Sequence, residues 1–259
     1  MKLSIKTHLS YTCAQPCDVL LQVEALSDAT QTCRATRLMF RPGTIHKEIP
    51  GNEGIGTRRW VKVENHFECH YETLVHLTRP VVDFGTLSET PRMEIPSDVI
   101  KYLMPSRYCQ SDLFLDFVAG QFEGLTGGAS VAAMSNWIYR NFTYDIAASN
   151  AATSATDSFA SQTGVCRDYA HVLISFVRAA GIPARFVSAY APDTTPQDFH
   201  AVVEVYLEGA WHLIDPTEMT DAPQIVRIGI GRDAADASFL TSYGWMDLQE
   251  QSVQVSRVG

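Results

Sequence analysis

Residues 164–185 read GVCRDYAHVLISFVRAAGIPAR, and this stretch carries the strongest indication of the fold class. Its apolar positions recur three and four residues apart, which is typical of an amphipathic helix. Gly181 and then Pro183 end the helix, because glycine caps a helix C-terminus and proline cannot continue it. The pattern therefore predicts that Cys166 lies in the first turn of a buried helix.

The start of a helix is a favourable position for a nucleophilic thiol. The N–H groups of the first turn lack intrahelical partners, and the helix dipole adds about half a positive charge there, so both favour thiolate over thiol. The same N–H groups can donate to the oxyanion that forms when a sulfur attacks a carbonyl. We predict Cys166 as the nucleophile, with the second oxyanion donor left open.

A second pattern places a histidine beside an aspartate. Glu208-Gly209 is typical of a two-residue hairpin turn, which makes Leu207 face Ala210. In that register His200 and Asp215 are diagonal neighbours on one face of the hairpin, about 7–8 Å apart. A carboxylate in this place orients the imidazole, whose other nitrogen exchanges a proton with the thiol. We therefore predict His200 as general base and acid, and Asp215 as the orienting group.

The rest of the chain predicts two domains, residues 1–96 and residues 97–259. Short alternating stretches without helical period favour an antiparallel β domain in the first part. A proline-rich linker follows, with the boundary near Pro96, and helical periods begin after it. The predicted strands are 3–9, 19–26, 35–40, the run 60–77, 184–190 and 200–207, and the predicted helices are 112–122 and 130–142, with a surface loop or weak helix at 147–161.

Composition limits the partners. Acidic residues number 29 against 20 basic ones, for a net charge of -9, and no basic stripe is present, so nucleic acid is not an expected partner. No run of about 18 apolar residues is found, and the N-terminus does not resemble a signal peptide, so we expect a cytoplasmic protein without a membrane segment. The six cysteines are expected to remain thiols.

No metal or cofactor is predicted. In a strand, His66 and His70 share a face with Glu68, whereas Cys69 points the other way, which argues against a metal site there. His171 lies on a different face of its helix from Cys166, so we expect a packing role for it.

Four segments resemble the transglutaminase-like superfamily: Gly164 to His171, Gly181 to Arg185, His200 before a strand, and Trp211 to Thr217. The resemblance covers about residues 106–217 and implies an α+β fold, in which a papain-like core of helices on an antiparallel sheet follows an N-terminal β-sandwich-like domain of the kind seen in bacterial members. It assigns Cys166, His200 and Asp215 the catalytic roles given above. The chain departs from the eukaryotic cross-linking enzymes, because it has no calcium loop rich in carboxylates.

The sequence thus predicts a cysteine hydrolase that cleaves peptide or other amide bonds through an acyl-enzyme on Cys166. Its substrate would be a peptide, a protein or a small amide. Transfer of the acyl group to an amine, as in transglutaminases, is the alternative, because both reactions share the acyl-enzyme. A non-catalytic binding module is a weaker hypothesis, since all three site residues are present. The natural substrate and the oligomeric state stay open.

Overall fold

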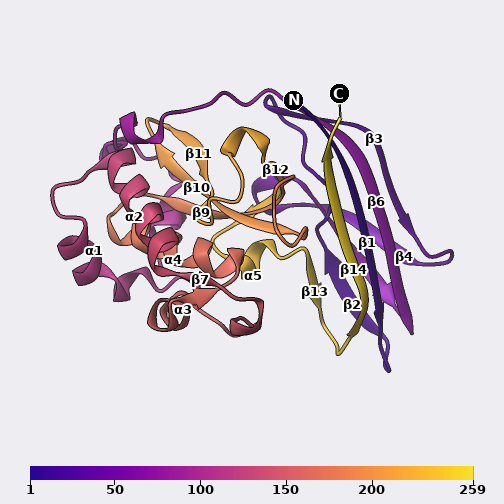
Figure 1. Ribbon diagram of the computed structural model, residues 1–259. Coiled ribbons are helices and arrows are strands. Elements are labelled where there is room, and N and C mark those ends of the chain that lie inside the picture. The colour runs from indigo at the N-terminus through magenta and orange to yellow at the C-terminus, as the bar shows by residue number, and fades with distance from the viewer. Residues whose placement is uncertain (259) are drawn as a thin grey trace.

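A computed structural model describes residues 1–258 and shows a β-sandwich beside a part made of helices, one further four-stranded sheet and a two-stranded one (Figure 1). Both marked ends of the chain lie at the same end of the sandwich. This α+β arrangement agrees with the predicted fold class.

Two four-stranded antiparallel sheets make up the sandwich. The first has the strand order β14-β1-β6-β3 and the second the order β13-β2-β5-β4. Their bounds are Asp247–Arg257 for β14, Lys2–Thr12 for β1, His66–Leu77 for β6, Gln31–Phe40 for β3, Leu240–Ser242 for β13, Cys17–Leu21 for β2, Thr57–Val63 for β5 and Ile45–Pro50 for β4.

Alternating side chains explain why these strands form a sandwich. Along β1, Leu3, Ile5, Thr7 and Leu9 are buried, whereas the residues that alternate with them, Ser4, Lys6 and His8, face outward. The inward side chains of both sheets share one apolar core, to which Tyr190 and Val226 of the third sheet also belong. The two parts of the molecule are therefore packed against each other rather than joined only by a linker.

The C-terminal strands differ from the predicted division at residue 96. We expected residues 97–259 to form one catalytic domain, but β14 pairs with β1 over its whole length and β13 pairs with β2. The physical reason is that β1 and β2 would otherwise each present a row of unpaired N–H and C=O groups at a sheet edge. Strand pairing between the two ends of the chain leaves no local sequence signal, so the periodicity could not reveal it.

The third sheet has the strand order β11-β10-β9-β12, and all its pairs are antiparallel. These strands are Ala210–Ile214, His200–Leu207, Ala184–Tyr190 and Val226–Gly231, and a short parallel pair joins β7 (Thr143–Tyr144) to β8 (Thr163–Gly164). The helices are α1 (Leu115–Gln121), α2 (Gly127–Asn141), α3 (Ala155–Ser161), α4 (Cys166–Ala179) and α5 (Ala234–Ala237). Short 3-10 helices span Asn52–Gly54, Phe84–Thr86, Arg92–Glu94, Ile100–Leu103, Ser111–Leu113, Ile146–Ala148 and Ala222–Gln224.

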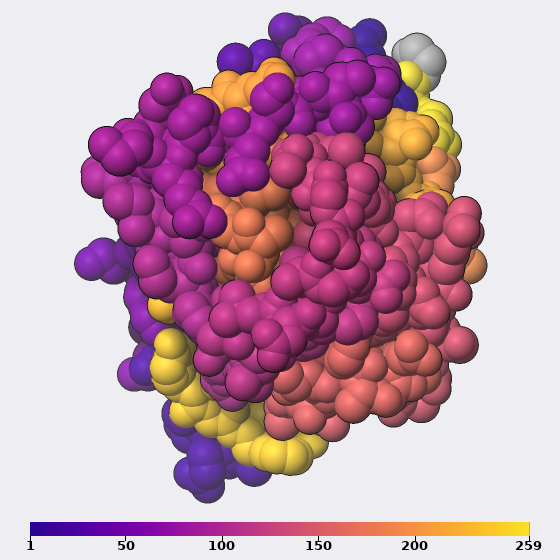
Figure 2. All heavy atoms as spheres, turned by 90° about the vertical axis from the view of Figure 1, so that its left-hand side faces the viewer, coloured from indigo at the N-terminus to yellow at the C-terminus, as the bar shows by residue number. Residues whose placement is uncertain are grey.

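Helix α4 is the central element of this part. It packs on β9 and β10 and is itself covered by α2 and α3, so twelve of its fourteen residues are buried. Burying a side chain such as Leu173 or Phe176 contributes roughly 1.5–3 kcal/mol. Figure 2 looks onto this helical side, where the orange atoms of the later strands are visible mainly in a hollow between the magenta helices and the purple linker. The site is built at the first turn of a helix held rigidly from all sides.

The predicted elements around the site match the structure closely. Strands at 184–190 and 200–207 are present with those bounds, and α4 ends before Gly181, whose φ is 82°. The segment 147–161 contains a helix, α3, which begins with a capping box between Ser154 and Asp157. The run 60–77 is broken at residues 64–65, so that β5 and β6 belong to different sheets of the sandwich.

Within residues 1–258, no helix combines the length and the hydrophobicity that are needed to cross a membrane.

Candidate active site

Cys166 is the first residue of α4, as the sequence predicts. Val165, in extended conformation, is its N-cap, and the buried carboxylate of Asp168 accepts a hydrogen bond of 2.9 Å from the Val165 N–H. This contact fixes the turn from β8 into the helix, because an acidic side chain in the first turn satisfies a free N–H and interacts favourably with the helix dipole. The Arg167 guanidinium lies 3.6 Å from the same carboxylate.

Gly164 allows this close approach. A Cβ at position 164 would lie 2.6 Å from the Cβ of Asp168, a distance that real side chains do not tolerate. Glycine is therefore required just before the nucleophile, because only a residue without a side chain lets the Asp168 cap reach the chain.

The hairpin of β10 and β11 brings the other two predicted residues together. Leu207 pairs with Ala210, as predicted from the Glu208-Gly209 turn. His200 opens β10 and Asp215 follows the end of β11, and His200 Nε2 lies 2.8 Å from Asp215 Oδ2. The predicted contact between imidazole and carboxylate is confirmed.

Asp215 is itself fixed by several donors. Its Oδ1 accepts hydrogen bonds from the N–H and the hydroxyl of Thr217, at 2.9 and 2.7 Å, and its Oδ2 accepts a further one from the Thr220 N–H at 3.2 Å. These three hydrogen bonds hold the buried carboxylate in its orientation toward His200.

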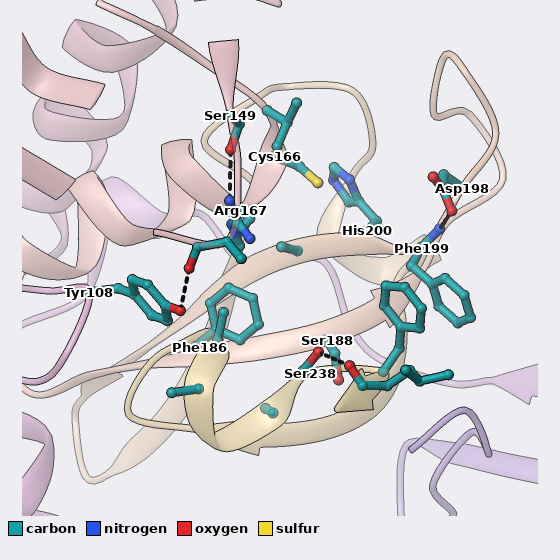
Figure 3. A pocket seen from close by; sticks show the side chains of 18 of the residues that line it. Tyr108, Ser149, Cys166, Arg167, Phe186, Ser188, Asp198, Phe199, His200 and Ser238 are labelled. Carbon is teal, nitrogen blue, oxygen red and sulfur yellow. Dashed lines mark hydrogen bonds between the residues drawn. The ribbon is translucent and has the colours of Figure 1, made fainter. Parts of the chain in front are cut away.

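The thiol and the imidazole face each other across the end of the sheet. Figure 3 shows the Cys166 sulfur pointing toward the ring of His200. Since Nε2 is taken by Asp215, the nitrogen left for the sulfur is Nδ1. Cys166 is 9% exposed and His200 3%, so the pair is largely shielded from water but the sulfur remains reachable from one side.

The surroundings of His200 favour its protonated form. Burial alone would lower the pKa of this imidazole, but its hydrogen bonds to Asp215 and Cys166, together with their charges, raise the pKa to about 10. An imidazolium between a thiolate and a carboxylate is the resting state expected of a cysteine nucleophile paired with a histidine.

The raised pKa of His200 predicts a contribution to stability that is lost at alkaline pH. The folded protein holds this proton up to about pH 10, whereas the unfolded chain releases it near pH 6.5. The contribution is fully present below about pH 6.5 and is lost as the pH rises through about 10. We expect the difference in unfolding free energy between wild type and His200→Gln, measured in urea at several pH values across this interval, to shrink steadily. A difference that stays constant would contradict the raised pKa.

A cavity of about 650 Å³ opens in front of the sulfur. One wall comes from the loop that precedes β10. Another comes from the segment that leads into β13 and from the start of β13 itself, so a strand of the sandwich contributes to the cleft. Phe199 and Phe239, one from each wall, stack with ring centroids 4.2 Å apart. The residues around the cavity include Tyr108, Tyr144, Ile146, Arg167, Phe186, Ser188, Asp198, Ala234 and Leu240.

The chain resembles known proteins in this same region. Residues 118–216 match the model of the transglutaminase-like superfamily. The chain also superposes on a candidate cysteine protease from Cytophaga hutchinsonii, with 33% identity and a TM-score of 0.94, over 99% of this chain and 90% of that one. This chain belongs to the transglutaminase-like superfamily.

Two relatives of this transglutaminase-like chain are matched over shorter stretches. The kyphoscoliosis peptidase of Homo sapiens is 36% identical over 99 residues, which cover 34% of this chain and 15% of the peptidase. An uncharacterised protein of Mycobacterium leprae is 26% identical over 117 residues, or 42% of each chain. The chain thus spans less than half the length of the curated relatives it matches. Together, these likenesses support a cysteine-type enzyme in general terms.

Tyr144 also lines the cavity, although no signal in the sequence indicated a role for it in the reaction. Tyr144 lies within reach of both the backbone N–H and the thiol of Cys166, because β7 pairs with β8 and sets Tyr144 beside Gly164. Burial, followed by the nearby charge of Cys166, raises the pKa of this phenol, so it stays a hydrogen-bond donor. The two-residue strands leave no periodicity, so the pairing could not be predicted from the sequence.

His171, in contrast, lies away from the cleft. Its Nε2 accepts a hydrogen bond of 3.1 Å from the Ala234 N–H, and its ring stacks on Tyr108. Complete burial, followed by the charges of Arg167 and Arg178, holds the pKa of His171 well below its ordinary value, so the ring is neutral and accepts this bond. The contact ties α4 to the segment before α5, which agrees with the predicted packing role.

Proposed function

We propose that this protein is a cysteine hydrolase that cleaves peptide bonds, or closely related amide bonds, through an acyl-enzyme on Cys166. The observation that carries the proposal is the hydrogen bond of 2.8 Å from His200 to Asp215, on an imidazole toward which the Cys166 sulfur points (Figure 3). Two similar proteins, the candidate cysteine protease and the human peptidase, give further support for peptide substrates.

The reaction would proceed in two steps. In the first, the Cys166 thiolate attacks the carbonyl carbon, and the tetrahedral intermediate collapses as the C–N bond breaks and the His200 imidazolium gives its proton to the departing amine. In the second, neutral His200 takes a proton from water, which attacks the thioester and releases the carboxylic acid and the thiolate. Asp215 keeps its charge throughout and holds His200 Nε2, so that Nδ1 faces the sulfur.

The oxyanion of both steps would be bound by two donors. One is the Cys166 N–H, which belongs to the first turn of α4 and lacks an intrahelical acceptor. The other is the Tyr144 hydroxyl, which lies beside that N–H and beside the sulfur. Donors fixed in advance around a position where charge develops act mainly on the transition state.

The variant Tyr144→Phe is expected to lower kcat by about 100-fold and to change KM little, because the donor is needed only once the oxyanion forms. The measurement is steady-state hydrolysis of a fluorogenic peptide. Tyr169→Phe is the matched control. The ring centroids of Tyr169 and Tyr144 lie 5.9 Å apart, but Tyr169 has no role in the proposed reaction. Equal losses in the two variants would show that Tyr144 only fills space.

The experiment that tests the proposed function is product analysis by mass spectrometry, on a mixture of unstructured peptides with and without a primary amine in excess. Hydrolysis predicts new carboxyl termini in both samples and none with Cys166→Ala. If the acyl group is transferred to the added amine, the same peptides carry a new amide in place of the carboxyl terminus. That product would mean that the amine reacts with the acyl-enzyme faster than water does in the cleft. No change in any peptide, together with failure of small amides to react, would overturn the proposal and favour a binding module.

A further inference from the structure

Four of the eight histidines gather on one face of the sandwich, away from the cleft. On β6, His66, His70 and His76 alternate with buried side chains and so face outward, as does His8 on β1. From the sequence only the histidines of β6 could be placed on this face, because the pairing of β1 with β6 could not be predicted.

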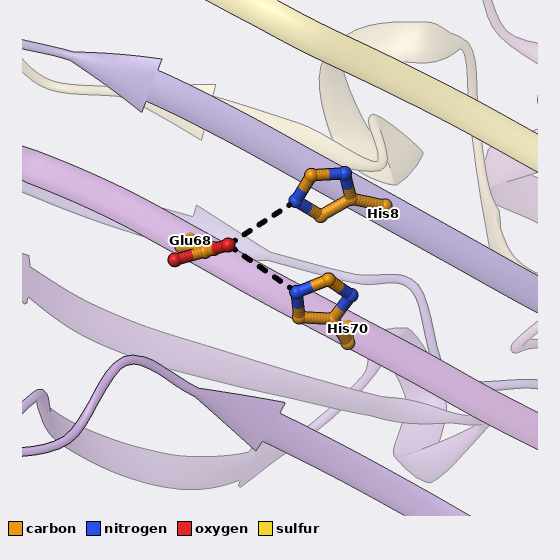
Figure 4. Close-up of side chains that lie close together, drawn as sticks. All are labelled: His8, Glu68 and His70. Carbon is orange, nitrogen blue, oxygen red and sulfur yellow. Dashed lines mark hydrogen bonds and ion pairs between the residues drawn. The ribbon is translucent and has the colours of Figure 1, made fainter.

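The antiparallel register places two of these histidines side by side. His8 pairs with His70, and their rings stack with centroids 4.2 Å apart and planes 6° apart. Glu68, two residues before His70 on the same face, extends its carboxylate toward one nitrogen of each ring (Figure 4). Strand pairing therefore brings two imidazoles and one carboxylate to a single point.

The distances within this cluster are those of ligand atoms around one metal ion. Glu68 Oε1 lies 3.5 Å from His8 Nε2 and 3.3 Å from His70 Nε2, and all three ligand atoms lie within 4.8 Å of one another. A tetrahedral zinc ion at roughly 2.0–2.2 Å from each ligand atom requires these atoms to be about 3.3–3.5 Å apart. Small side-chain shifts would complete the geometry.

Neither metal-binding nitrogen is engaged outside the cluster: His70 Nε2 contacts Glu68 Oε1 at 3.3 Å, and His8 Nε2 lies 3.5 Å from the same oxygen. His8 Nε2 is buried and makes no hydrogen bond within the described residues. The other ring nitrogen, His8 Nδ1, lies 3.3 Å from Glu250 Oε1 on the neighbouring strand β14. A carboxylate on the far nitrogen is the usual support of a metal-binding histidine, since it fixes the tautomer and the ring orientation.

We propose that His8 Nε2, His70 Nε2 and the Glu68 carboxylate bind a divalent transition-metal ion, Zn²⁺ in the first place, with a water molecule as the fourth ligand. Two imidazoles and a carboxylate suit zinc better than calcium or magnesium, which prefer oxygen ligands alone. None of the three residues lines the cleft, so the ion has no part in the proposed hydrolysis. The ion would link β1 to β6 and, through the contact of His8 with Glu250, stabilise the pairing of β14 with β1.

The test is a zinc titration of tag-free protein in competition with a chromophoric chelator. It uses Cys166→Ala as the parent, because the active-site thiolate would itself bind zinc. His8→Gln and His70→Gln in this parent are each expected to weaken zinc binding at least 100-fold, and Glu250→Gln about 10-fold. His76→Gln is the matched control, since His76 lies on the same face of β6 but outside the cluster, and it should bind like the parent.

A spectrum of the Co²⁺ form identifies the ligands. The expected spectrum has the visible bands of a four-coordinate ion without the intense near-ultraviolet charge transfer of a cobalt–thiolate bond, and His8→Gln should abolish it. Circular dichroism of the metal-free variants verifies that they are folded. Equal zinc affinity of the parent and His8→Gln, a thiolate band, or no saturable binding by the folded parent would each overturn the proposal.

Discussion

Asparagine in place of Asp215 is expected to lower kcat/KM for peptide hydrolysis by about 10³–10⁴-fold. The carboxylate accepts the proton on His200 Nε2, and this leaves Nδ1 facing the sulfur. An asparagine amide can turn its NH₂ group toward Nε2 instead, which moves the ring proton to Nδ1 and removes the base. The comparison is made by steady-state kinetics on purified wild type and Asp215→Asn.

Folding has to be separated from chemistry in this comparison, because Asp215 also accepts hydrogen bonds from Thr217 and Thr220. Thermal unfolding of the variant is therefore measured in parallel, and a cooperative transition shows that the lost activity is not lost structure. His171→Gln is the matched control: it changes another buried histidine, on the helix that carries Cys166, and the new amide oxygen can still accept from the Ala234 N–H. Greater damage in His171→Gln than in Asp215→Asn would contradict the assignment.

The second large effect is expected in thiol reactivity. Cys166 should react with iodoacetamide about 100-fold faster near pH 6 than an ordinary thiol, of which only about 0.3% is ionised at that pH. The reason is the ion pair with His200, whose pKa is raised to about 10. His200→Ala removes the imidazolium and should bring the rate down to that of a free cysteine. The rates are read at each cysteine by peptide mass spectrometry between about pH 4 and 9.

The other five cysteines serve as internal standards in the same sample. Burial raises the pKa of Cys69 and of Cys109 to about 12, so these two should be labelled most slowly. If Cys166 reacts no faster than the standards, or keeps its rate in His200→Ala, the thiolate and imidazolium pair is absent. That result would also contradict the proposed hydrolase function. The standards are Cys13, Cys17, Cys33, Cys69 and Cys109.

The sequence predicted the elements whose signals are local. The helix from Cys166 was readable because its period, its glycine end and its proline stop lie within one stretch of chain. The hairpin was readable because Glu208 and Gly209, both at positive φ, form a turn that fixes the register on either side. From that register alone, His200 and Asp215 could be placed together, although their roles in catalysis remain predictions.

Contacts between segments that are far apart in the chain could not be predicted from the sequence. Tyr144 stands beside Cys166 through a strand of two residues, too short for any period. Strand β13 has only three residues, and in β14 only Val253 and Val255 are buried, so nothing in their sequence tells which sheet edge each of them joins. For the same reason, the partner of His70 stayed hidden, since it lies on a strand more than fifty residues earlier.

The pairing of β1 with β14 also sets the order in which the molecule can form during synthesis. Strand β1 leaves the ribosome before its neighbour β14, which follows only after α4 and the third sheet have been made. Until then one edge of β1 is open, and contacts so far apart along the chain form slowly. The wall of the cleft formed by the segment before β13, which includes Phe239, is also synthesised after the third sheet. A nascent chain therefore carries its cysteine, histidine and aspartate before it has the last wall of the groove, around Phe239, that would hold a substrate against them.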